Sequence, residues 1–147
     1  MTNLQESLPK ELLRTNRSGA YSCSTIVDCN TRKYHGLLVV PVPELDDENH
    51  VLLSSLDVTV IQHGAEFNLG LHKYQGNNYS PMGHKYIREF DCDKVPTTLY
   101  RVGGVILKKE VVFQHYENRI LIRYTPVFYP HLTLPTTLSV TTYVAQR

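Results

Sequence analysis

The sequence predicts an all-β fold, an antiparallel β-sandwich made of short strands. β-Branched and aromatic residues dominate short runs that Gly, Pro, Asn and Asp interrupt. Three dipeptides have the composition of tight hairpin turns, namely His63-Gly64, Gly103-Gly104 and Glu117-Asn118. Helical periodicity is weak and confined to residues 4–13. With 147 residues, the chain (residues 1–147) is expected to form a single domain with its own core.

The expected strands follow one another between turn and loop signals. Pro41, Pro43 and the acidic residues 44–48 indicate an exposed loop, and the glycine-rich residues 70–83 indicate a longer irregular segment. The strands are expected at residues 21–27, 34–42, 51–62, 66–71, 85–90, 97–102, 105–116 and 119–126.

The last two turns predict the register of a three-stranded meander. Alternate side chains of a strand share a face, so both turns assign the apolar residues to one buried side, with Phe113 opposite Ile122. The expected pairs are His115–Ile120, Phe113–Ile122, Val111–Tyr124, Val105–Val102 and Leu107–Tyr100. The opposite face is expected to carry Lys108, Glu110, Val112, Gln114 and Arg123.

Composition excludes several classes of partner. The net charge of +1 indicates neither a nucleic-acid partner nor an anionic membrane surface. No apolar run approaches the length of a membrane span, and residues 1–10 lack a signal-peptide core. Cys23, Cys29 and Cys92 have no Cys-x-x-Cys spacing, so we expect reduced thiols, a cytoplasmic location and no metal site. No nucleotide-binding loop is present, and no cofactor is expected.

No catalytic residues are predicted. Glycoside hydrolysis normally needs two carboxyl groups placed across the scissile bond, whereas the acids of this chain are scattered. Asp91 and Asp93 are the one close pair outside the loop at residues 44–48, and we interpret them as part of a solvated bend before Pro96. The seven histidines are interpreted as surface or hydrogen-bonded core residues.

Two motifs carry a resemblance to a known family. The run Asn-Thr-Arg-Lys-Tyr-His-Gly-Leu-Leu at residues 30–38 and the stretch Thr-Asn-Arg-Ser-Gly-Ala-Tyr at residues 15–21 resemble the N-terminal domain of bacterial and archaeal glycogen debranching enzymes. Residues 52–57, Pro81-x-Gly83 and residues 107–111 are also similar to that family. The chain departs from it at Leu12, Ala20 and Val58, and residues 126–147 are interpreted as a tail without similarity.

The resemblance implies a supersandwich-like domain that precedes a helical (α/α)6 barrel, where the catalytic carboxylates of the family lie. The parent protein would be a glycoside hydrolase, an amylo-alpha-1,6-glucosidase of glycogen catabolism, and this chain alone would be inactive. Its partners would be an α-glucan (glycogen or limit dextrin) or the C-terminal (α/α)6 domain. Because the family's sandwich continues past residue 126, the chain resembles part of that domain. The alternative is a free-standing sandwich that binds carbohydrate or protein without turnover.

Four residues of the two motifs are the candidate site: Asn16, Arg32, Tyr34 and His35. In the functional interpretation, Arg32 and His35 donate hydrogen bonds to sugar hydroxyls or to carboxylates of a neighbouring domain, and Tyr34 stacks on the ligand. In the structural interpretation, Arg32 and Tyr34 hold loops together or form the domain seam. On a regular strand, Arg32 and Tyr34 would face away from His35 unless Gly36 introduced a bulge.

Strand pairing at the end of the sandwich also bears on assembly. If the sheet is truncated near Tyr124, one strand lacks a neighbour and exposes unpaired backbone groups. We therefore expect either a homodimer or a tail that folds back from Pro126 to cover such a strand.

Overall fold

A computed structural model describes residues 3–127 and 139–145 of the chain. Three short helical elements are α1 (Leu4–Ser7), η1 (Gln75–Asn77) and η2 (Gly83–Tyr86). All other described elements are strands, and every strand pairing is antiparallel, which confirms the predicted all-β class.

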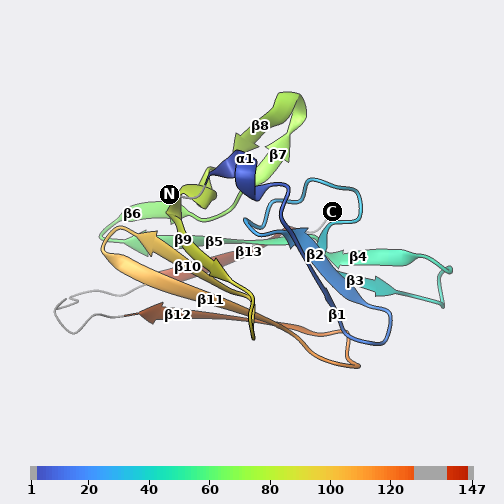
Figure 1. The fold of residues 1–147 in the computed structure, drawn as a ribbon. Helices are drawn as coiled ribbons and strands as arrows, with labels where there is room; N and C mark the ends of the chain where they lie inside the picture. Colours follow the sequence, from blue (N-terminus) through green and yellow to red (C-terminus); the bar gives the residue numbers. More distant parts are fainter. Residues whose placement is uncertain (1–2, 128–138, 146–147) are drawn as a thin grey trace.

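The strands form four sheets (Figure 1). The first has the order β1-β2-β3-β4, with β1 at Glu11–Thr15, β2 at Tyr21–Thr25, β3 at Gly36–Pro41 and β4 at Asn49–Leu53. The second has the order β12-β11-β10-β9, with β9 at Ile87–Asp91, β10 at Thr97–Val102, β11 at Val105–Phe113 and β12 at Ile120–Val127. The third has the order β13-β5-β6, with β5 at Ser55–Gln62, β6 at Ala65–Asn68 and β13 at Ser139–Ala145. The hairpin of β7 (His72–Tyr74) and β8 (Asn78–Ser80) makes the fourth.

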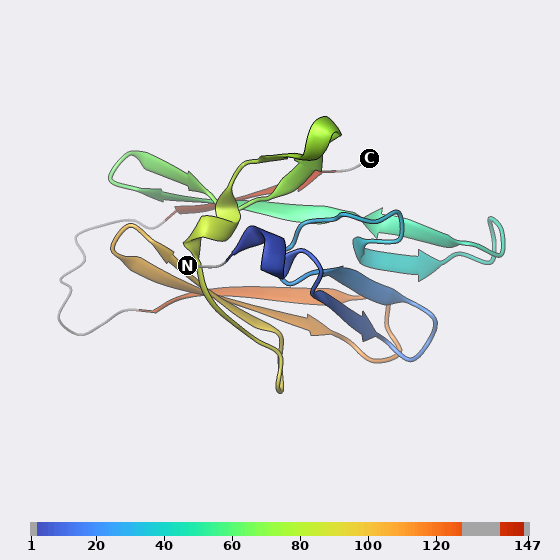
Figure 2. The same cartoon turned by 45° about the horizontal axis from the view of Figure 1, so that its top comes forward.

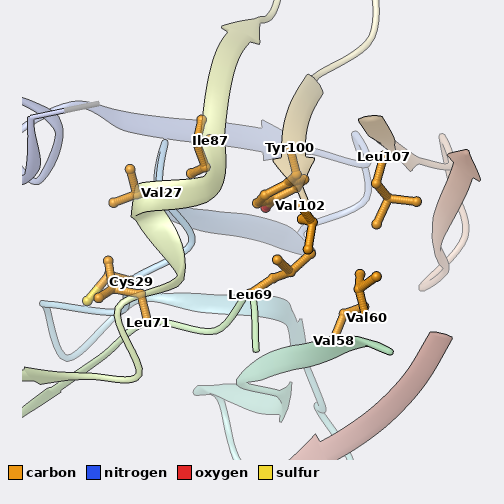
Figure 3. Close-up of a cluster of buried hydrophobic side chains, with 10 residues drawn as sticks. All are labelled: Val27, Cys29, Val58, Val60, Leu69, Leu71, Ile87, Tyr100, Val102 and Leu107. Carbon is orange, nitrogen blue, oxygen red and sulfur yellow. The ribbon is translucent and has the colours of Figure 1, made fainter. Parts of the chain in front are cut away.

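The sandwich has β9 to β12 in one layer and β5, β6 and β13 in the other (Figures 1 and 2). Its core lies between these layers, because strands β5, β10 and β11 each contribute buried apolar side chains to one cluster (Figure 3). The segments before β3 and before β7 close the cluster with Val27, Cys29, Leu69 and Leu71. Burial of this apolar surface is the main term that stabilises the arrangement.

The predicted meander is confirmed for its first hairpin and shifted in its second. Val102 pairs with Val105 and Tyr100 with Leu107, as expected from the Gly103-Gly104 turn. In the second hairpin Phe113 pairs with Ile120, so the predicted register is wrong by two residues. A shift of two keeps every side chain on its predicted face, but Phe113 is half-buried rather than enclosed in the core.

The shift arises because the loop between β11 and β12 is longer than the predicted two-residue turn. The backbone N–H of Gln114 donates to the carbonyl oxygen of Arg119, which leaves residues 115–118 as the loop. Tyr116 adopts a positive φ of 62°, and its backbone N–H donates to the carbonyl oxygen of Asn16. A tertiary contact therefore holds the loop in its longer form.

Two expectations about the elements need correction. The helical signal at residues 4–13 corresponds to a helix only at Leu4–Ser7, and Glu11–Thr15 is strand β1. The single strand expected at residues 51–62 is two strands in different sheets, which meet at Ser54. The carbonyl oxygen of Ser54 accepts hydrogen bonds from the backbone N–H of Leu37 and from Asn30 Nδ2. These contacts fix the point at which the chain passes from one sheet to the other.

Strand β13 lies within residues 126–147, which we had interpreted as a tail. It pairs along β5 with Val140 opposite Val60, so this part of the chain folds back onto a strand, as one of the two assembly expectations describes. The strand that it covers is β5, whereas β12, which contains Tyr124, remains the edge of its own sheet. Residues 128–138 and 146–147 lie outside the described residues, and the homodimer stays a prediction.

Candidate functional site

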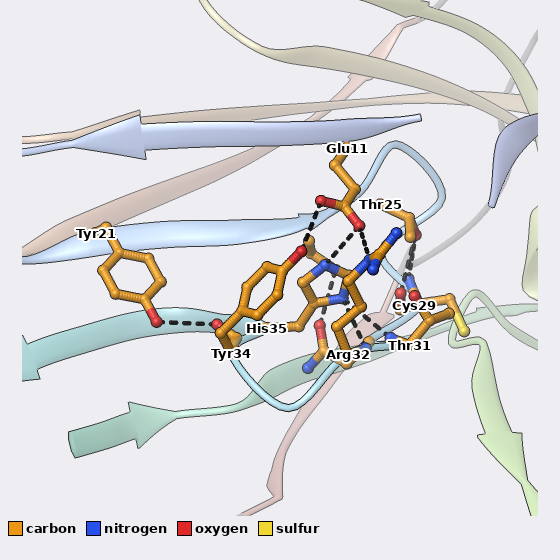
Figure 4. A network of polar contacts seen from close by, with 10 residues as sticks. Glu11, Tyr21, Thr25, Cys29, Thr31, Arg32, Tyr34 and His35 are labelled. Carbon is orange, nitrogen blue, oxygen red and sulfur yellow. Dashed lines mark hydrogen bonds and ion pairs between the residues drawn. The ribbon is translucent and has the colours of Figure 1, made fainter. Parts of the chain in front are cut away.

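The candidate site is organised around Glu11, the first residue of β1 (Figure 4). Its Oε1 lies 2.5 Å from Arg32 Nε and 3.2 Å from His35 Nε2, and its Oε2 accepts a hydrogen bond of 3.3 Å from the Tyr34 hydroxyl. Three of the four predicted site residues thus converge on one carboxylate. Sequence reasoning missed Glu11 because it lies in the segment with the weak helical signal.

Convergence is possible because Arg32 and Tyr34 lie in a turn that precedes β3. The backbone N–H of His35 donates to the Arg32 carbonyl oxygen at 3.1 Å, and β3 begins only at Gly36. Arg32 and Tyr34 therefore do not follow the alternation of side chains along a strand. The expectation that they would face away from His35 is wrong. Arg32 and Tyr34 remain accessible, whereas the His35 side chain is fully buried.

The hydrogen bonds of His35 define the state of its ring. Nδ1 accepts from the backbone N–H groups of Thr31 at 3.0 Å and Arg32 at 3.3 Å. A nitrogen that accepts carries no proton, so the neutral ring has its proton on Nε2. Nε2 faces Glu11, but the contact lacks hydrogen-bond geometry, and Nε2 has no hydrogen-bond partner among the described residues.

One cluster of metal-ligand types occurs among the described residues. The ligand atoms of Glu11, Cys23 and His35 lie within 4.8 Å of one another. Coordination by His35 would need an unprotonated Nε2, and the proton would then move to Nδ1, against the N–H groups of Thr31 and Arg32. The hydrogen bonds of the ring thus disfavour a metal ion at this cluster.

Charge around Glu11 is arranged to keep the carboxylate ionised. Partial burial alone would raise the pKa of Glu11, but the hydrogen bond and positive charge of Arg32, with His35, lower it below its ordinary value. Burial and the negative charge of Glu11 raise the pKa of the Cys23 thiol, with Arg32 opposing them. The cluster therefore presents a carboxylate, a guanidinium and a neutral thiol at neutral pH.

A surface groove of about 630 Å³ runs from Glu11 along one face of the first hairpin. Leu13 pairs with Cys23 and Thr15 with Tyr21, so the side chains of these positions and of Glu11 share a face. Tyr34 forms part of the wall, and the Tyr21 hydroxyl donates to the Tyr34 carbonyl oxygen at 3.0 Å. Leu13 is 59% exposed and Tyr34 47% exposed, which leaves apolar surface open in the groove.

Asn16, the fourth predicted residue, is not brought to this cluster. It follows the opposite end of β1 from Glu11, about 16 Å away at the rise of a strand. Its buried side chain accepts from the backbone N–H groups of Ser18 and Ala20, and donates to Glu117 and Asn118. These hydrogen bonds hold the turn before β2 and join it to the loop between β11 and β12.

Fold and site together define a β-sandwich domain with an open groove that ends at a Glu–Arg–Tyr cluster. Comparison with known families identifies it more closely: the model of the glycogen debranching enzyme N-terminal domain matches residues 10–147. The chain belongs to this family. The match includes residues 126–147, for which we had expected no similarity. Neither curated proteins nor solved structures gave a match.

Among residues 3–127 and 139–145, none of the helices is long and apolar enough to cross a bilayer.

Proposed function

We propose that this chain is the non-catalytic N-terminal domain of a glycogen debranching enzyme, and that its groove positions an α-glucan branch for a catalytic helical domain. The observation that carries the proposal is the exposed Tyr34 beside the Glu11–Arg32 pair at the end of the groove. The domain itself hydrolyses neither α-1,4 nor α-1,6 bonds in this proposal, and the protein acts in the cytoplasm in glycogen catabolism.

The chemistry of the cluster suits a chain of neutral sugars. An exposed tyrosine ring offers a face for the apolar side of a glucose ring, and the chain contains no Trp that could take this role. The carboxylate of Glu11 accepts hydrogen bonds from sugar hydroxyls, and the remaining N–H groups of Arg32 donate to them. Because Glu11 and Arg32 neutralise each other, this cluster at the end of the groove carries no net charge that would select an ionic ligand.

A second candidate for the same surface is the seam with the helical domain. The exposed apolar surface of Leu13 and Tyr34 favours this alternative, because exposed apolar patches often mark an interface. Under this hypothesis, the groove would bury against protein and would not bind free glucan. A free-standing sandwich that binds carbohydrate or protein without turnover is the remaining alternative.

Binding of glycogen and of maltooligosaccharides to the full chain tests the proposal. In affinity electrophoresis and calorimetry, Tyr34→Ala should weaken glucan binding by about tenfold, the effect of about 1.4 kcal/mol of lost stacking. Tyr74→Ala is the matched control, because Tyr74 is 57% exposed on the β7–β8 hairpin outside the groove. Absence of glucan binding by the wild-type chain, or equal losses in both variants, would contradict the proposal.

Hydrolysis is a separate measurement. The full chain should release no glucose from a limit dextrin. Release that a single carboxylate substitution abolishes would contradict a non-catalytic role.

A further inference from the structure

We propose that a second groove, at the end of β1 that lies away from Glu11, binds a small organic phosphate such as a sugar monophosphate. This groove has a volume of about 460 Å³, within the range of about 300–1,000 Å³ of small-molecule sites. Four of its lining residues are basic and none is acidic. They are Arg14, Arg17, Lys94 and His115.

The four basic residues come from separate segments that the fold brings together. Arg14 lies on β1 and Arg17 in the turn that follows it, where Arg17 has a positive φ of 66°. Lys94 lies in the loop between β9 and β10, and His115 in the loop between β11 and β12. Their sequence positions therefore give no sign of a common site, and the net charge of +1 conceals the local concentration of positive charge.

None of these four side chains forms an ion pair within the described part of the chain. The acid nearest to His115 in sequence, Glu117, is bound to Gln114 and Arg119. Like charges that have no ion-pair partner repel one another, and a bound anion removes that cost. The groove thus has an electrostatic reason to bind an anion.

Arg14 is the best placed of the four to recognise a phosphate. Its Nη2 donates to the Cys92 carbonyl oxygen at 3.2 Å, which fixes the guanidinium beside the β9–β10 loop. Its Nε is buried and has no hydrogen-bond partner among the described residues. Guanidinium groups have five donors and bind phosphate oxygens in pairs. The buried Nε is out of a ligand's reach, so the donors that Arg14 keeps for a ligand are those of its terminal nitrogens that Cys92 does not take.

The rest of the groove indicates what the anion is attached to. Val95, Pro96 and the side chains of residues 111–113 give it an apolar wall beside the basic residues. An inorganic ion would leave this wall unused, whereas a ring that carries a phosphate would cover it. A sugar monophosphate combines both features at a size that suits the groove.

This groove is distinct from the proposed glucan groove but adjoins it. Both are lined by Leu13, Thr15 and Arg17, whereas Lys94 and His115 line only the second. A neutral glucan carries no charge that the basic residues of the second groove could bind. The proposals of glucan binding and of phosphate binding can therefore fail independently.

Calorimetric titration of the full chain with glucose 6-phosphate, inorganic phosphate and glucose tests the inference. We expect glucose 6-phosphate to bind more tightly than inorganic phosphate, and glucose not to bind this groove. Lys94→Gln should weaken glucose 6-phosphate binding about fivefold, and Arg17→Gln with Lys94→Gln more than about twentyfold. Arg101→Gln removes an exposed cation of β10 outside both grooves and should leave affinity unchanged.

Two results would overturn the inference. One is a failure of the wild-type chain to bind glucose 6-phosphate at low ionic strength, with circular dichroism showing that the chain is folded. The other is an equal loss in Lys94→Gln and Arg101→Gln, because this would mean unspecific attraction of the anion. Maltooligosaccharide binding measured on the Lys94→Gln variant should be unchanged, which separates this groove from the proposed glucan groove.

Discussion

The side chain of Asn16 donates a hydrogen bond of 3.0 Å to the carbonyl oxygen of Glu117, and this contact joins the first hairpin to the loop between β11 and β12. The backbone of Asn16 takes part as well, because its carbonyl oxygen accepts from the Tyr116 N–H. Two loops 101 residues apart in sequence are thereby held together. The contact gives the Asn16 side chain a structural role, although this residue of the motif does not reach the groove.

The first prediction concerns this contact. Asn16→Ala removes four side-chain hydrogen bonds and leaves the buried N–H of Ala20 and the part-buried Ser18 N–H and Glu117 carbonyl without this partner. We expect the free energy of unfolding to fall by about 3 kcal/mol, measured by urea denaturation. Asn118→Ala is the control, because it removes one contact of an exposed residue and should cost less than about 1 kcal/mol. Similar costs for both variants would contradict the structural role of Asn16.

The second prediction concerns the ion pair of Lys109 and Asp28. The side chain of Lys109 is 7% exposed and that of Asp28 is 46% exposed. Burial alone would lower the pKa of Lys109, but the charge of Asp28 raises it above its ordinary value, so the buried lysine stays charged. Asp28→Asn should cost about 2–4 kcal/mol of unfolding free energy, because it leaves this charge without a partner.

Lys109→Met is the matched variant for this pair. Water can solvate Asp28 once the lysine is gone, so we expect a loss of about 1 kcal/mol or less by the same urea denaturation. The positive φ of 57° at Asp28 is tolerated by Asn and adds no strain to Asp28→Asn. A larger loss for Lys109→Met than for Asp28→Asn would contradict this account of the pair.

Local patterns in the sequence were sufficient to predict the β class and the faces of the meander. The alternation of apolar residues in β11 depends only on neighbours in the strand, so Val105 and Leu107 were correctly assigned to the buried side. The register of β11 against β12 could not be predicted, because Asn16 determines the length of the loop from a distant part of the chain. The break at Ser54 depends in the same way on contacts with Asn30 and Leu37.

The candidate site was predictable only in part. Arg32, Tyr34 and His35 lie within a few residues of one another, and their density drew attention to the motif. Glu11 and Cys23 join them through strand pairing, in which β1 and β2 place both side chains on one face. Neither residue lies in the motif at residues 30–38, so spacing alone could not include them. Their contribution to ligand binding stays a prediction.

The third prediction concerns the alkaline limit of stability. Burial of Cys29, only partly offset by Lys73, raises the pKa of its thiol from 9.0 to about 11. A group whose pKa is raised by folding stabilises the folded state below its unfolded pKa, and this contribution is lost as the pH rises through the folded value. Between pH 9 and about 11, the unfolding free energy should therefore fall by about 2–3 kcal/mol on account of Cys29.

Comparison of variants isolates this effect from other groups that titrate at high pH. Cys29→Ala should lose less stability than the wild-type chain between pH 8.5 and about 11, when unfolding is measured with a reducing agent. Cys92→Ala should retain the wild-type pH dependence, because Cys92 is exposed. Parallel pH profiles of the wild-type chain and Cys29→Ala would show that the thiol of Cys29 is not the source of the loss.

The last prediction concerns Gly83, which follows the Pro81 of the family-like Pro-x-Gly stretch. A Cβ atom at this position would lie 2.2 Å from both the carbonyl carbon and the carbonyl oxygen of Leu69, and these are backbone atoms that cannot rotate away. The N–H of Gly83 donates to the Gly70 carbonyl oxygen at 2.9 Å, so the two segments are also joined by their backbones. Gly83→Ala should reduce the free energy of unfolding by about 3 kcal/mol or more in urea denaturation.

The control variant is Gly104→Ala. It has open space around the added methyl group and no positive φ, and it should change the free energy of unfolding by less than about 0.5 kcal/mol. If Gly83→Ala proves as stable as Gly104→Ala, the close packing of η2 against the segment before β7 is incorrect.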